Sequence, residues 1–309
     1  MFEKLKGRFD GQDSLSASSE SKDRRRSRDS DRKSDKSPAR SSHSDYPSEQ
    51  AAPPPSYPQD SSRPAPFEKE TPPPFATNFA SVSLHMSDRI RLLHLPLEQR
   101  NALRTAIQAT WPRGIQSERE YYSSWEFKLS GNPWSPYGED ALYARRLTRA
   151  VLATLYDAGW VLYVATDISR NPGDKDNLFF RHQSPAPTPR EWFSVTFSRG
   201  DRIRLIDAPA QVVQDTLAAL AAETQKHEPY RVSGVYEIKL NGWPFAASGG
   251  STMVSRSICL KLFSVLEKNG FTVSASMDQK YGGEHGQETD SWHVSRPLGW
   301  VEGAPVYHQ

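Results

Sequence analysis

The stretch DRIRL at residues 88–92 decides the fold, because the same letters return at residues 201–205. Downstream of each copy, EFKLSG at 126–131 is matched by EIKLNG at 237–242. The matched segments are displaced by roughly 110 residues, which is far longer than the unit of a solenoid repeat. The sequence therefore predicts a tandem duplication of a whole domain.

Both copies predict the same succession of elements. Apolar and polar residues alternate in WEFKL at 125–129 and in YEIKL at 236–240, which is the pattern of a half-buried strand. Apolar residues at helical spacing follow in both copies, namely Leu147, Val151 and Leu155 in the first, and Ile258, Leu262 and Leu266 in the second. The patterns together predict an α+β fold with two β-β-α-β-α-β-β units, each a largely antiparallel sheet with helices on one face.

The domain boundaries follow from the limits of the two copies. We expect a disordered region at 1–80, a first repeat at 81–183, a Pro-rich linker at 184–192, a second repeat at 193–297 and a tail at 298–309. Matched positions such as Leu129 and Leu240 should be equally buried. Because the linker is short, we also expect the repeats to pack against each other.

The first 80 residues have the composition of a disordered region. No Val, Ile or Trp precedes Val82, so this part of the chain has little apolar surface with which to offset its conformational entropy. Within it, three arginines precede Ser27, and Pro38 follows Ser37, which makes both serines candidate phosphosites. The basic cluster at 21–42 is interpreted as a solvated linker, with nuclear import or polyanion binding as alternatives.

Composition and motifs exclude several classes of protein. No apolar run is long enough for a membrane span, and the first residues lack the apolar core of a signal peptide, so we expect a soluble protein in the cytoplasm, the nucleus or both. The single cysteine, Cys259, excludes an internal disulfide and a Cys-based zinc site, and its apolar neighbours predict a buried small side chain. No motif of nucleophile, base, metal ligand or phosphate-binding loop was found, so no cofactor, metal or catalytic residue is predicted.

Four arginines that occur at matched positions are candidate contact residues. Arg89 and Arg91 on one strand correspond to Arg202 and Arg204 in the second copy, and strand alternation places each pair on one face of its sheet. These arginines either form cross-strand pairs with the matched glutamates Glu126 and Glu237, or belong to a partner-binding face that occurs twice.

The turns after the matched strands each carry a large aromatic residue. Trp134 follows Gly131 and Pro133, and Trp243 lies within the equivalent turn, where the first copy has Asn132. Such a side chain either fills the base of the following helix or protrudes as an interface anchor. Both tryptophans are candidate partner contacts, and Trp243 is the better one because it has no aromatic counterpart.

The same segments resemble a known family. The motifs are EFKLSGNPW at 126–134, GWVLYVATDIS at 159–169, DKDNLFF at 174–180 and ETDSW at 288–292. They resemble a largely uncharacterised two-copy family of filamentous-fungal proteins, and the likeness spans residues 85–296. Some members of that family are labelled Mediator subunit 13-like, which implies a link to regulation of transcription. The resemblance brings no catalytic residues with it.

These observations favour a non-catalytic protein-interaction or regulatory module that binds an unidentified protein partner. The alternatives are a nucleic-acid-binding protein, which the nearly balanced charge of the chain disfavours, and an enzyme of unrecognised type. No membrane is expected as a partner.

Overall fold

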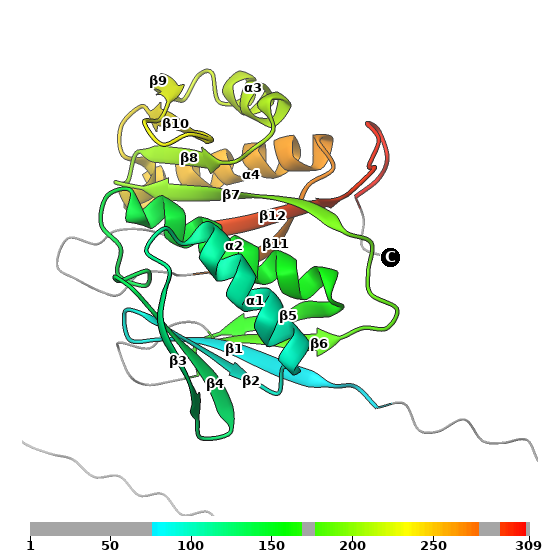
Figure 1. The fold of residues 1–309 in the computed structure, drawn as a ribbon. Coiled ribbons are helices and arrows are strands. Elements are labelled where there is room, and N and C mark those ends of the chain that lie inside the picture. Colours follow the sequence, from blue (N-terminus) through cyan, green and yellow to red (C-terminus); the bar gives the residue numbers. More distant parts are fainter. Residues whose placement is uncertain (1–75, 169–176, 278–290, 307–309) are drawn as a thin grey trace, which may run out of the picture. The chain divides into compact units, whose positions relative to one another are not determined.

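A computed structural model describes residues 76–168, 177–277 and 291–306 (Figure 1). Residues 1–75 of the predicted disordered region, with both candidate phosphosites, Ser27 and Ser37, lie outside these residues. In the part of the chain that is described, no helix combines the length and the apolar character that crossing a membrane requires.

The first repeat is a six-stranded antiparallel sheet with two helices. The strands lie in the order β3-β4-β2-β1-β6-β5, so the hairpin nearest the N-terminus is at the centre of the sheet. The elements are β1 (Phe79–His85), β2 (Arg89–Leu93), α1 (Leu97–Thr110), β3 (Ile115–Tyr121), β4 (Ser124–Leu129), α2 (Asp140–Asp157), β5 (Trp160–Thr166) and β6 (Asn177–His182).

The second repeat has the same topology, with strand order β9-β10-β8-β7-β12-β11. Two short 3-10 helices, η1 and η2, precede its last helix. The elements are β7 (Arg190–Ser198), β8 (Arg202–Ile206), α3 (Ala210–Ala219), β9 (Thr224–Pro229), β10 (Val235–Leu240), η1 (Pro244–Ala246), η2 (Gly249–Ser251), α4 (Thr252–Lys268), β11 (Thr272–Met277) and β12 (Ser291–Pro297). The predicted α+β duplication is therefore confirmed.

One strand in each repeat is additional to the predicted β-β-α-β-α-β-β order. The sequences of β3, IQSEREY, and β9, TQKHEP, are polar, and both strands lie at a sheet edge. An edge strand that buries almost no side chain has no apolar alternation by which to recognise it. The observed order in each repeat is β-β-α-β-β-α-β-β.

Two boundaries also shift by a few residues. The first strand begins at Phe79, so two residues assigned to the N-terminal region belong to the sheet. Likewise β7 begins at Arg190, within the predicted linker 184–192. In both strands the extra residues continue the pairing with the neighbouring strand, β6 or β12.

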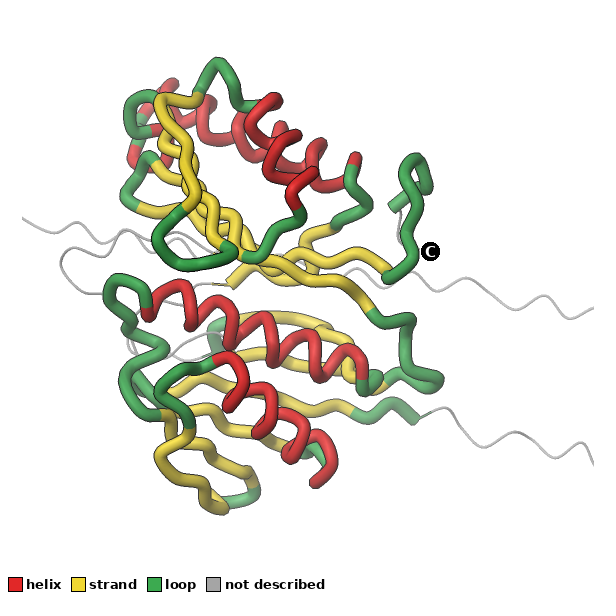
Figure 2. The backbone as a smooth tube through the Cα atoms, turned by 45° about the horizontal axis from the view of Figure 1, so that its top comes forward, coloured by secondary structure: helices red, strands yellow, loops and turns green. Residues whose placement is uncertain are grey.

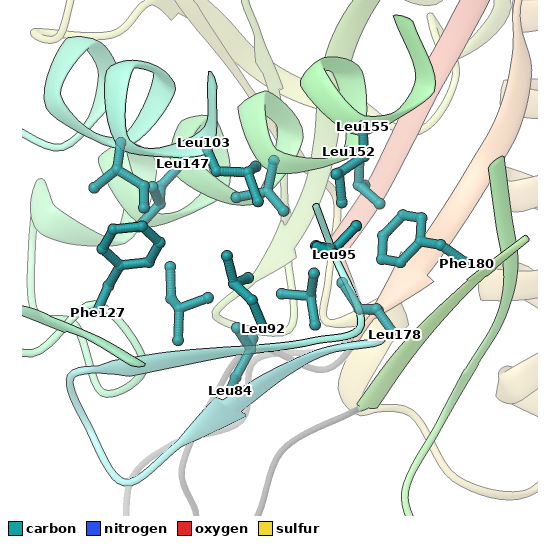
Figure 3. Packing of buried hydrophobic residues seen from close by; sticks show 14 of the residues in the cluster. Leu84, Leu92, Leu95, Leu103, Phe127, Leu147, Leu152, Leu155, Leu178 and Phe180 are labelled. Carbon is teal, nitrogen blue, oxygen red and sulfur yellow. The ribbon is translucent and has the colours of Figure 1, made fainter. Parts of the chain in front are cut away.

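Each repeat has a hydrophobic core between its sheet and its helices, and Figure 3 shows that of the first repeat. In the first core, Leu147 and Leu155 of α2 lie over Phe127 and Phe180 of the sheet. Matched positions are buried alike, as predicted, including Leu129 with Leu240 and Leu147 with Ile258. The helices therefore cover the face of each sheet that the alternating sequences predict to be apolar.

The two repeats belong to one compact unit and pack against each other, as the short linker predicted. Helix α2 of the first repeat lies against β7 of the second, so sheets and helices form alternating layers (Figure 2). Consequently α2 is covered on both sides, by its own sheet and by the second sheet. Helix α4 is covered by its own sheet on one side, and no other sheet covers its other side among the described residues.

Candidate functional site

The matched arginines of the first repeat surround a buried carboxylate. Arg89 Nη1 donates to Glu126 Oε1 at 2.6 Å, Arg91 Nε donates to Oε2 at 2.7 Å, and Arg119 Nε donates to Oε1 at 2.8 Å. Burial opposes ionisation of Glu126, but the hydrogen bonds from the arginines outweigh it and hold the carboxyl pKa below its ordinary value. The Glu126 carboxylate is thus bound by three arginines of its own repeat.

The second repeat reproduces this arrangement around Glu237. Arg202 Nη1 and Arg204 Nε donate to its two oxygens at 2.5 and 2.8 Å. Arg204 also lies over the ring of Tyr230, with its guanidinium carbon 4.7 Å from the ring centre. Burial again opposes ionisation, and hydrogen bonding to Arg204 leads the contributions that lower the pKa of Glu237. All the matched arginines therefore form cross-strand pairs, and a contact role for them stays a prediction.

The two candidate tryptophans have opposite environments. Trp134 is completely buried in the first core, and its indole Nε1 donates to the carbonyl oxygen of Arg89 at 2.9 Å. The prediction that Trp134 contacts a partner is therefore wrong, because no part of the side chain reaches the surface. Trp243 is 65% exposed, as expected for an anchor, while Phe245 takes the internal position and packs on Phe197.

A Ser–His pair that sequence spacing did not reveal lies between the repeats. Ser194 Oγ and His293 Nδ1 are 3.0 Å apart on the neighbouring strands β7 and β12. Both residues are completely buried, and burial followed by the charges of Arg149 and Arg145 lowers the pKa of His293 to about 3. A pair closed to solvent has no access to a substrate, so the structure offers no catalytic role for it.

The described residues meet the requirements of neither a metal site nor a reactive thiol. Over the described ranges, no group of three or more His, Cys, Asp or Glu side chains is placed to hold a metal ion. Cys259 is half-buried on α4, and burial raises the pKa of its thiol, which keeps the thiol protonated and weakly nucleophilic.

The contact between the repeats depends on α2. Asp207, which follows β8, accepts hydrogen bonds from two arginines of α2. Arg146 Nη2 donates to Oδ1 and Arg149 Nη2 donates to Oδ2, each at 2.6 Å. Burial opposes ionisation of Asp207, but these hydrogen bonds hold its pKa below the ordinary range. Sequence reasoning missed this cluster, because its arginines have no charged counterpart in α4, where Ser257 and Leu260 stand.

Apolar side chains complete the same interface. Leu142 of α2 is buried with Ile206, Val232 and Val235 of the second repeat. The rings of Tyr156 and Trp192 meet edge-to-face, with centroids 5.8 Å apart. The face of α2 that points away from its own sheet is therefore fully used within the chain.

Among the described residues, no further repeat covers the equivalent face of α4, which carries apolar side chains; Phe263, at the edge of this face, stacks on Trp292 of its own sheet with ring centroids 4.8 Å apart. Relative to α2, Met253 takes the place of Leu142, Leu260 that of Arg149, and Phe263 that of Leu152. Four apolar side chains on this face are between 39% and 64% exposed. We call them the α4 stripe: Met253, Val254, Leu260 and Phe263. Exposed apolar residues grouped on one face of a helix are typical of a binding surface.

A groove of about 470 Å³ continues the α4 stripe. It lies beside α4 between Phe263, Phe271 and Val306. The first repeat has its equivalent, a groove of about 240 Å³ that Leu152 and Tyr156 line together with Trp192 from the second repeat. One groove is thus bounded by a neighbouring repeat, and the other has no such neighbour.

Comparison with known proteins recovers the duplication. One domain model of a protein family matches the chain twice, over residues 78–181 and 191–295, which is more than half of its length. No curated protein and no solved structure gives a significant match. The chain therefore belongs to the family that this domain defines, and it contains two copies of the domain.

Proposed function

We propose that this chain is a non-catalytic protein-interaction module whose main contact surface is the α4 stripe. The observation that carries this proposal is the difference between equivalent helices. The face of α2 is buried by the second repeat, whereas the same face of α4 exposes Met253, Val254, Leu260 and Phe263. Covering such a face with a protein surface removes apolar area from water, which favours association.

Trp243 extends this proposed surface. It immediately precedes η1, which packs against α4, and most of its side chain is exposed. Exposed tryptophans are frequent hot spots in protein interfaces, because they bury a large area at low cost in side-chain entropy. Trp243 is accordingly a second contact point, on the turn that precedes η1.

A protein partner suits this surface better than a nucleic acid does. Each pair of matched arginines is already bound to a carboxylate, that of Glu126 or Glu237, and the α4 stripe is apolar. Nucleic-acid binding requires cations that are free to replace counterions along a phosphate backbone. We therefore keep nucleic acid as the less favoured alternative.

We place the binding inside the cell, in the cytoplasm or the nucleus, with a regulatory and transcription-linked role. The basic cluster at 21–42 supports import into the nucleus, and the lone cysteine suits a reducing compartment. The transcription link is supported by the resemblance to the fungal two-copy proteins that carry the Mediator subunit 13-like label.

The test is capture of proteins from a cell extract by the full chain and by two matched variants. Leu260→Glu puts a charge in the α4 stripe, and Leu97→Glu makes the same change at a leucine of similar exposure on α1, 62% against 64%. The proposal expects Leu260→Glu to lose captured proteins that Leu97→Glu retains, at unchanged melting temperature. Equal capture by both variants would contradict it.

A further inference from the structure

We propose that the α4 stripe of one molecule docks on the outer face of β1 and β6 of a second copy, repeating the contact that joins the two repeats. This inference rests on the proposed function and names the partner of the α4 stripe. Each repeat has one helical face and one outer sheet face. The contact between the repeats uses the helical face of the first and the sheet face of the second, which leaves the helical face of the second repeat and the sheet face of the first.

The internal contact shows what such a helical face covers. Polar side chains on the outer face of β7 and β12 are completely or almost completely buried next to α2, although each points away from its own core; they are Ser194, Thr196, Ser291, His293 and Ser295. Arg145 of α2 donates to Ser291 Oγ at 3.1 Å. A small-polar and aromatic sheet face thus fits against the outward face of the helix.

Strand pairing identifies the equivalent surface on the first sheet. Phe179 pairs with Ser81 across β6 and β1, as His293 pairs with Ser194 across β12 and β7. By the same register, Phe79 stands where the second repeat has Trp192. The side chain of Phe79 is 48% exposed, and its ring meets that of Tyr163 edge-to-face, with centroids 5.7 Å apart.

The substituted residues change this sheet face in two opposite ways, since Phe179 makes it more apolar than its covered counterpart and Arg181, at the position of Ser295, adds a charge. Phe179 replaces His293, so the position next to Ser81 carries a phenyl ring in place of an imidazole. The ionic cluster of the internal contact is also missing on both sides. His94 stands at the position of Asp207, and Leu260 stands at that of Arg149. In the proposed contact, Leu260 therefore faces His94 where the internal contact has the ion pair between Arg149 and Asp207.

The groove beside α4 has room for the aromatic residue that this docking requires. Inside the chain, Trp192 borders the smaller groove and its ring meets Tyr156. In the proposed contact, Phe79 of the second copy enters the larger groove beside Phe263. The exposed phenyl ring of Phe79 thus corresponds to Trp192, and the larger groove corresponds to the groove that Trp192 borders, with Glu267 at the position of Tyr156.

Such a contact joins two different surfaces, so it does not close on itself in a dimer. Each molecule keeps one free α4 stripe or one free sheet face, and addition continues unless the geometry closes a ring. The mass of the assembly should therefore increase with protein concentration, beyond that of a dimer.

Sedimentation velocity of the purified full-length chain tests the proposal. The wild-type protein and Leu97→Glu should assemble as concentration rises, whereas Leu260→Glu and Phe79→Glu should each remain monomeric. Circular dichroism confirms that the variants are folded. An equimolar mixture of the two monomeric variants should form a dimer and nothing larger, because it contains one intact α4 stripe and one intact sheet face that can meet.

The outcomes separate this inference from the proposed function. A wild-type chain that stays monomeric at every concentration overturns self-docking, as does a mixture of the two variants that fails to form dimers. If Leu260→Glu nevertheless loses captured proteins from the extract, the α4 stripe remains a binding surface for a different protein. If Leu260→Glu changes neither assembly nor capture, both proposals fail.

Discussion

Glu126 lies on the outer face of the first sheet, which is not part of the core. Three guanidinium groups surround its carboxylate there. The carboxylate is 1% exposed, so it is covered by the arginines that it holds. Removing one partner of such a cluster leaves the other charges without compensation, which costs more than the pair contributes when intact.

We predict that Glu126→Gln lowers the free energy of unfolding by about 2 kcal/mol, because Arg89 and Arg91 lose their common acceptor charge. Urea denaturation followed by tryptophan fluorescence measures the change. Glu120→Gln on β3 is the matched control, since Glu120 is exposed and its substitution should leave stability unchanged. Equal stability of both variants would show that the cluster contributes nothing.

A buried neutral imidazole makes stability depend on pH. The pKa of His293 is about 3 in the folded protein and 6.5 in the unfolded chain, so the unfolded state binds more protons between these values. The contribution of neutral His293 to the free energy of unfolding is fully present above pH 6.5. It decreases as the pH falls toward 3, by up to about 1.4 kcal/mol per pH unit.

We predict that His293→Phe removes this part of the pH dependence. Phenylalanine occupies the equivalent position in the first repeat, at Phe179, so the substitution suits the fold. The measurement is the free energy of unfolding at pH 7 and at pH 5. The difference between the two values should be smaller for the variant than for the wild type, and an unchanged difference would mean that His293 does not titrate as described.

Among the elements, the two long helices end alike. Gly159 and Gly270 follow α2 and α4 with φ of 84° and 77°, in the left-handed region where a side chain is strained. A Cβ on Gly270 would lie 2.3 Å from the ring of Trp300, and one on Gly159 would lie 2.6 Å from the carbonyl oxygen of Gln183.

We predict that Gly270→Ala lowers the free energy of unfolding by about 2 kcal/mol, since strain in the left-handed region adds to displacement of Trp300. Gly250→Ala is the control, because a Cβ there meets nothing within 4 Å and φ is not in the left-handed region. Thermal unfolding should separate the two variants, and equal melting temperatures would contradict the packing described.

The duplication made most elements predictable, because each weak pattern could be compared with its copy. Leu147 and Ile258 identify the same buried helix face, and Leu129 and Leu240 the same strand face. The edge strands β3 and β9 escaped prediction because they bury so few side chains. The position of Trp134 after a turn leaves both a core role and a contact role open, and only the structure shows that the indole reaches into the core.

The contact surface was harder to recognise than the fold. An apolar position on a helix is normally interpreted as core, so Leu260 and Phe263 gave no separate signal. The useful comparison is between the helices: α4 has apolar residues on the face that α2 uses for Arg149 and other contacts with the second repeat. Equally, Asp207 and Arg146 come together only because the repeats stack.

At the scale of the whole two-repeat unit, the ion cluster at Asp207 joins the layers. We predict that Asp207→Asn weakens the contact between the repeats, since Arg146 and Arg149 lose the charge they share. Hydrogen exchange should become faster in α2 and β7, whereas the centre of the first sheet should change little. Uniform acceleration throughout both repeats would instead indicate a general loss of stability.

Among the residues that the structure describes, the α4 stripe and the outer face of β1 and β6 are the two surfaces of the stacked arrangement that no further layer covers. The most direct test is hydrogen–deuterium exchange of the full-length chain at low and at high protein concentration. We predict that concentration slows exchange in two separate places, Thr252–Lys268 of α4 and Phe79–His85 of β1. Exchange that is independent of concentration in both segments, or slowed only elsewhere, would contradict docking between copies.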